Sequence, residues 1–90
     1  MKTRMTIKEM FREIVLNIGI IENMTDANFA IEHIGDFYYR TYIEKVYGQM
    51  QNGEKTAREI LGEIARNLSE RVFNGMAVLV GRKLQNVINA

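Results

Sequence analysis

The segment 37–47 contains the residues whose chemistry stands out most in this sequence. All four tyrosines of the chain lie in it, and two cations, Arg40 and Lys45, are interleaved with them. A tyrosine ring can stack on a base while its hydroxyl forms a hydrogen bond. An arginine offers a planar fork for phosphate oxygens. With two cations further along the chain, this pattern predicts a site for a nucleotide or a cyclic-nucleotide-like anion at Tyr38, Tyr39, Arg40, Tyr42, Lys45, Tyr47, Arg66 and Arg71.

Packing is the alternative interpretation of the same tyrosines, and it is the favoured one. Tyr38 and Tyr42 are four residues apart, as are Tyr39 and Ile43, so both pairs follow helical spacing. Tyrosine is also enriched in protein interfaces. These rings are therefore expected either in the core or between subunits when they do not bind a ligand.

Residues that could support catalysis or bind a metal are present without a recognisable arrangement. The carboxylates form helical pairs, and His33 is the single histidine. A di-metal carboxylate bundle needs Glu-x-x-His on two helices, which one histidine cannot supply. The sequence has no cysteine, no nucleophile motif of the G-x-S-x-G type and no glycine-rich phosphate loop. We therefore predict no enzyme activity, no metal and no cofactor.

Composition limits the class of protein. The chain has 90 residues and a net charge of +1, which predicts a single domain over 1–90 without a strong electrostatic signal for nucleic acid. No apolar stretch approaches the roughly 20 residues that a membrane span needs. The absence of cysteine fits a reducing compartment, so a cytoplasmic location is expected. A single core of this size is marginal, which favours self-association.

Hydrophobic periodicity and capping signals predict an all-α fold of three or four helices. Thr6 and Glu9 have the form of a capping box at the start of the first helix. Thr25 or Asp26 is expected to cap the second helix. Asn74-Gly75 leaves open whether the last two helices are separate or continuous. The predicted helices cover about 6–18, 26–50, 55–73 and 76–88.

The second predicted helix has apolar residues on two faces. Ile31 and Ile34 belong to the first face, and Ile43 and Val46 belong to a rotated second face. A helix with two apolar faces must bury both of them. We therefore expect a helical bundle completed by self-association, with one face of 26–50 against another subunit.

Small residues recur in the last part of the chain at helical spacing. Ala65 and Ser69 are four residues apart, as are Ala77 and Gly81. Each pair therefore lies on one helix face, and such faces would let another helix approach closely.

A degenerate helix-turn-helix in 57–85 is a DNA-binding alternative. Leu68 and Ser69 adjoin directly, so the residues of the usual turn are missing. The apolar stripe through Leu61, Ile64, Leu68 and Val72 also continues at unbroken helical phase, which favours a continuous helix.

No motif identifies a family. The leading functional hypothesis is a non-catalytic homo-oligomeric helical protein, a small accessory or virus-type regulator. It would capture a nucleotide-type anion, or a host or cellular protein that it inhibits, at surfaces between subunits. A nucleic-acid-binding regulator and a purely structural assembly subunit are the alternatives, and no membrane partner is expected.

Overall fold

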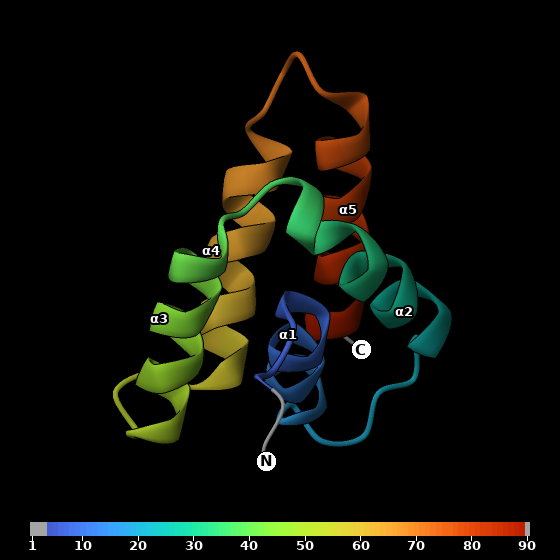
Figure 1. Cartoon of the computed structure of the whole chain (residues 1–90). Coiled ribbons are helices and arrows are strands. Elements are labelled where there is room, and N and C mark those ends of the chain that lie inside the picture. Colours follow the sequence, from blue (N-terminus) through green and yellow to red (C-terminus); the bar gives the residue numbers. More distant parts are fainter. Residues whose placement is uncertain (1–3, 90) are drawn as a thin grey trace.

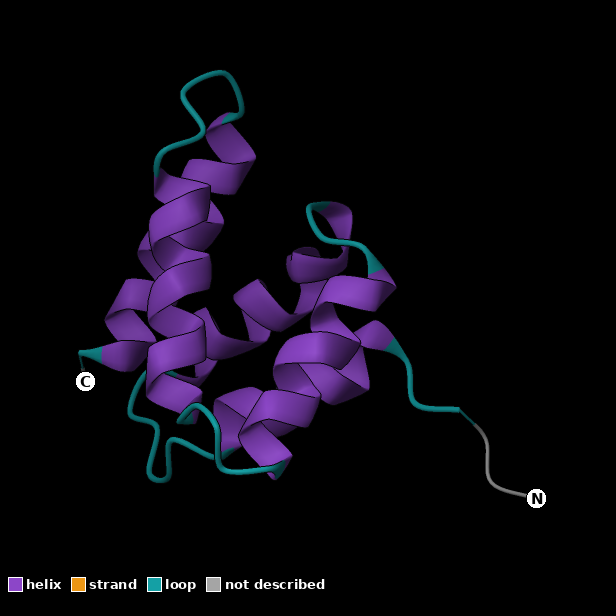
Figure 2. Ribbon diagram, turned by 90° about the vertical axis from the view of Figure 1, so that its left-hand side faces the viewer, coloured by secondary structure: helices purple, strands orange, loops and turns teal. Residues whose placement is uncertain are grey.

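A computed structural model describes residues 4–89 of the chain, and this part is folded into helices (Figure 1, Figure 2). The all-α prediction is confirmed, although the helix count differs from the expected three or four. A short 3-10 helix, η1 (Ile34–Asp36), follows the second α-helix. The α-helices are α1 (Ile7–Leu16), α2 (Met24–His33), α3 (Arg40–Gln51), α4 (Ala57–Ser69) and α5 (Gly75–Ile88).

Two helix starts use the same capping chemistry. The Thr6 hydroxyl accepts a hydrogen bond from the Glu9 amide, and the Glu9 carboxylate accepts one from the Thr6 amide. This confirms the predicted capping box at the start of α1. Thr56 and Glu59 form an equivalent box at α4, which the sequence also spells as Thr-x-x-Glu but which we did not predict.

The helices α4 and α5 run side by side in opposite directions and form a hairpin (Figure 1). Their contact is very close at Gly81. A Cβ atom at this position would lie 2.9 Å from the carbonyl oxygen of Ala65 and 3.0 Å from the amide nitrogen of Ser69. The prediction that small residues admit a close neighbouring helix is thus confirmed, and the neighbour belongs to the same chain.

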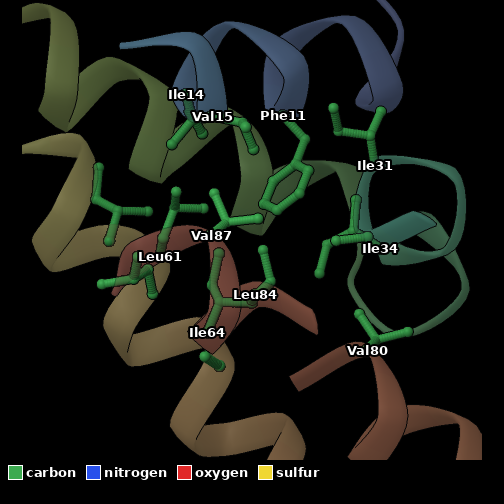
Figure 3. Packing of buried hydrophobic residues seen from close by; sticks show 14 of the residues in the cluster. Phe11, Ile14, Val15, Ile31, Ile34, Leu61, Ile64, Val80, Leu84 and Val87 are labelled. Atoms are coloured by element: carbon green, nitrogen blue, oxygen red, sulfur yellow. The ribbon is translucent and has the colours of Figure 1, made fainter. Parts of the chain in front are cut away.

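One aliphatic core joins the hairpin to the other helices. Phe11 of α1 is fully buried in one cluster with Ile34, Ile64 and Leu84, which come from three other elements (Figure 3). Among residues 4–89 no charged or polar residue is buried in this core. The core therefore depends on shape and apolar area rather than on a polar network.

The predicted single helix over 26–50 is wrong, because the chain leaves the helix between η1 and α3. Tyr39 has an extended backbone (φ −76°, ψ 152°) and occupies the N-cap position of α3. The break lets Ile34 before it and Ile43 after it both be fully buried within one chain. A second subunit is therefore not needed to cover the rotated apolar face.

The predicted helix over 55–73 is also too long. α4 ends at Ser69, and Val72 lies in the following turn with 82% of its surface exposed. Asn74 caps α5, because its side-chain oxygen accepts hydrogen bonds from the amides of Met76 and Ala77. The last two helices are therefore separate. Their antiparallel arrangement differs from the crossing of about 90–120° in a helix-turn-helix.

The start of the second helix differs from the prediction in detail. Asn23 occupies the N-cap position of α2, so Thr25 and Asp26 lie inside the first turn. Asp26 instead ties α2 to α5: its carboxylate lies 3.0 Å from the Lys83 ammonium and accepts a hydrogen bond of 2.9 Å from the Asn86 amide. The hydrogen bond from Asn86 and the contact with Lys83 hold the pKa of Asp26 below its ordinary value.

We expect this tie to make folding stability sensitive to acid. A carboxyl whose pKa is lowered by folding stabilises the protein above its unfolded pKa, and this contribution is lost as the pH falls through the folded pKa. Asp26→Asn should therefore reduce the drop in melting temperature between about pH 6 and about pH 3. Glu22→Gln, on the exposed link before α2, is the control. An unchanged acid sensitivity in Asp26→Asn would contradict the assignment.

We further expect Gly81→Ala to destabilise the protein although alanine favours helices. The added methyl group would collide with the backbone of α4, and such overpacking costs about 1–3 kcal/mol. Gly62→Ala is the matched control, since a Cβ there meets nothing within 4 Å and should stabilise α4 by about 0.5–1 kcal/mol. Urea unfolding measures both changes. A Gly81→Ala protein as stable as the wild type would contradict the close packing.

Candidate functional site

Three of the eight predicted ligand-binding residues come together at one place. Tyr38, Tyr39 and Arg71 line a pocket of about 390 Å³. We call it the tip pocket, because it lies where the turn of the α4–α5 hairpin meets the link between η1 and α3. Its lining consists of Gly35, Asp36, Phe37, Tyr38, Tyr39 and Arg71.

Two breaks in the helices build the tip pocket. The first is the non-helical link at 37–39, which exposes Tyr39 to solvent over 87% of its surface. The second is the turn at 70–74, which in both views projects beyond the rest of the described chain (Figure 1, Figure 2). The guanidinium carbon of Arg71 lies 5.5 Å from the centre of the Tyr38 ring, so a cation–π contact joins the two segments.

Tyr38 forms a wall of the tip pocket rather than a free stacking surface. Its ring stacks on the Tyr42 ring with centroids 4.8 Å apart, so one face of each ring is covered by the other ring. The Tyr38 hydroxyl is buried and lacks a hydrogen bond, although the Asn67 side chain lies near it. Burial raises the pKa of the Tyr38 and Tyr42 phenols. At Tyr38 this rise is partly offset, because Arg71 and Asn67 lower the pKa.

Arg40 lies outside the tip pocket and has a structural role. Its guanidinium bonds to Glu44 at 2.6 Å and donates to the carbonyl oxygen of Met5. Arg4 reaches the same Glu44 carboxylate at 2.8 Å. Hydrogen bonds from Arg40 and then Arg4 lower the pKa of Glu44. This cluster fastens the residues before α1 to α3.

The remaining predicted residues do not meet at the tip pocket either. Tyr47 is half-buried against the core, and Lys45 is exposed on α3. Arg66 is exposed on α4. Neither cation lines the pocket with Arg71. The structure thus separates the eight residues that the sequence grouped by type.

Sequence reasoning missed the most exposed apolar residues of this region. Phe73 is fully exposed (103%), next to the exposed Val72 on the projecting turn. Two further apolar side chains, Met76 and Leu79, are exposed on α5 at helical spacing. The sequence pattern predicts Val72 on the apolar stripe of a helix, and it indicates no role for Phe73. The available signal was their position directly before the turn residues Asn74-Gly75. We call Tyr39, Arg71, Val72 and Phe73, together with the tip pocket, the tip surface.

The residues considered for catalysis have structural partners instead. Glu9 and Glu59 cap helices, while Glu32 pairs with Lys8 at 2.7 Å. His33 lies 3.3 Å from Asp36 and packs against the Phe29 ring. Within 4–89 there is no group of three His, Cys, Asp or Glu side chains that could hold a metal ion. None of the helices described is long and apolar enough to cross a membrane.

The tip surface thus combines exposed apolar side chains, one open aromatic ring, a pocket and a pair of opposite charges. Such a set can bind a protein or a small planar molecule. Comparison of the chain with protein-family models, curated proteins and solved structures gives no match.

Proposed function

We propose that this protein is a non-catalytic binding protein that captures another protein through the tip surface. The main observation behind this proposal is the exposure of two neighbouring apolar side chains on a projecting turn: Val72 is 82% exposed and Phe73 is 103% exposed. Turns are ordinarily made of small and polar residues. Burying one such side chain is worth about 1.5–3 kcal/mol.

The surroundings of this pair match the anatomy of a protein interface. Tyr39 and Arg71 are of residue types enriched at energetic hot spots, both line the tip pocket, and Arg71 lies two residues before Phe73 in the same turn. Met76 and Leu79 extend the apolar area along α5. Single exposed apolar residues need no explanation, but a group of them around aromatic and arginine side chains favours an interaction site. An accessory or regulatory role in the cytoplasm remains a prediction that accompanies this proposal.

A photo-crosslinking amino acid at position 73 tests the proposal in the producing cell. We expect irradiation to give one discrete adduct with a protein, since Phe73 would lie at the centre of the contact. The same amino acid at Gln51, which is exposed at the end of α3 opposite to Tyr39, is the control. Adducts of equal yield at both positions, or no protein adduct at position 73, would refute the proposal.

A nucleotide-type ligand is the second candidate, and one observation favours it. The open ring of Tyr39 and the guanidinium of Arg71 line the same pocket, so one could stack on a base while the other holds a phosphate. The Asp36 carboxylate in that pocket acts against an anion. For this reason the protein partner is the better supported function.

Titration with adenosine monophosphate and its cyclic form, followed by calorimetry, tests the second candidate. Tyr39→Ala and Arg71→Ala should each weaken binding about tenfold or more, since stacking on a base is worth about 1–3 kcal/mol. Tyr47→Phe and Lys45→Ala alter the same residue types outside the tip pocket and should leave affinity unchanged. No binding by the wild type, or equal loss in the controls, would eliminate this candidate.

A further inference from the structure

We infer that the partner of the tip surface is a second copy of this chain, bound so that Phe73 of each copy enters the tip pocket of the other. This inference rests on the proposed function, that the tip surface binds protein. The observations behind it are the fully exposed Phe73 side chain and an open pocket lined by Arg71, which precedes Phe73 by two residues in the same turn. Neither feature has an occupant within the described chain.

The pocket is large enough for a phenyl ring, and three of the side chains that line it are aromatic. Its volume is about 390 Å³, whereas a cavity of about 150 Å³ suffices to hold benzene. The three aromatic residues are Phe37, Tyr38 and Tyr39. Aromatic pairs gain about 0.5–1.5 kcal/mol beyond the burial of their area. Phe73 of a second copy would therefore pack against the open ring of Tyr39 there.

The position of Phe73 favours a two-fold pair. Arg71 lines the tip pocket, and Phe73 follows it by two residues in the same turn. A two-fold axis pairs one surface with itself, so that a contact from the first copy to the second is repeated from the second to the first. One such axis near the turn would seat both phenyl rings at once.

The charges of the tip surface are self-complementary as well. Asp36 and Arg71 both line the pocket and have opposite charge. The Asp36 carboxylate is two-thirds exposed, and it lies 3.3 Å from the Nδ1 atom of His33. In a two-fold pair, Asp36 of one copy can face Arg71 of the other in two equivalent places. Opposite charges set in this way fix the register of an interface.

Sedimentation at increasing concentration tests the contact. The surface is small, so we expect a weak dimer that forms between about 1 µM and about 1 mM. Phe73→Ser should weaken association at least tenfold. Ile20→Ser, which removes an apolar residue of similar exposure from the link between α1 and α2, should have a much smaller effect. A wild type that stays monomeric over this range, or an equal effect of both substitutions, would overturn the inference.

An exchange of charges tests the two-fold geometry. Asp36→Arg alone would bring arginines together at both places, and Arg71→Asp alone would bring aspartates together there. Each single variant should therefore dimerise more weakly than the wild type. An equimolar mixture of the two should dimerise more tightly than either variant alone, because every pair of charges is again opposite. Circular dichroism confirms that both variants are folded. A mixture no tighter than its components would exclude the proposed pairing.

The outcomes also separate this inference from the proposed function. A monomeric wild type whose crosslinker at position 73 captures a protein of another mass would refute the second copy and leave the binding function in place. A dimer that is insensitive to Phe73→Ser would place self-association elsewhere and refute the inference. Absence of both association and crosslinking would refute both.

Discussion

The close approach of α4 and α5 at Gly81 is the constraint on which the rest of the structure depends. A Cβ atom at position 81 would lie only 2.9 Å from the backbone of α4, so no side chain fits at this position. The hairpin that results supplies Ile64, Leu68, Val80 and Leu84 to one core, against which α1 and α2 pack. It also sets the path of the turn at 70–74, and this turn carries Arg71 and Phe73.

Polar contacts at the margin of the core place the other half of the site. Asp26 joins α2 to α5, Lys8 joins α1 to Glu32 of α2, and Arg40 joins α3 to the residues before α1. Exposed ion pairs of this kind are worth little individually. Together they hold the α2–η1–α3 segment against the hairpin, so that residues 35–39 meet Arg71. The tip pocket is thus a product of the whole fold.

The sequence predicts helices well where one helix buries one face and begins with a cap. α1 follows from Thr6, Glu9 and the apolar stripe behind them. The break at 37–39 could not be predicted, because Phe37, Tyr38 and Tyr42 keep helical spacing across it. The reason for the break is tertiary: the broken chain buries Ile34, before the break, and Val46, after it, in one core. Val72 was misplaced for the opposite reason, since a residue can continue a periodic pattern after its helix has ended.

The candidate site could be predicted from the sequence only in part. The tyrosine–arginine segment named Tyr38 and Tyr39, and Arg71 was named by its charge. Their meeting depends on two loops about 30 residues apart, a relation that helical spacing does not contain. Residue type also gave no means of separating Arg40, held by Glu44, from Arg71, which faces solvent beside a ring.

The nearness of Phe73 to the tip pocket has a consequence for how far any assembly can grow. A protrusion and a recess on opposite sides of a molecule let each copy recruit the next, and the series ends in filaments. Here Phe73 and the pocket-lining Arg71 belong to one turn, so the inferred reciprocal contact would occupy Phe73 and the pocket together and leave no open end. Because Phe73 and the tip pocket of each copy would both be occupied in the dimer, assembly would stop at two copies and would not continue into a polymer.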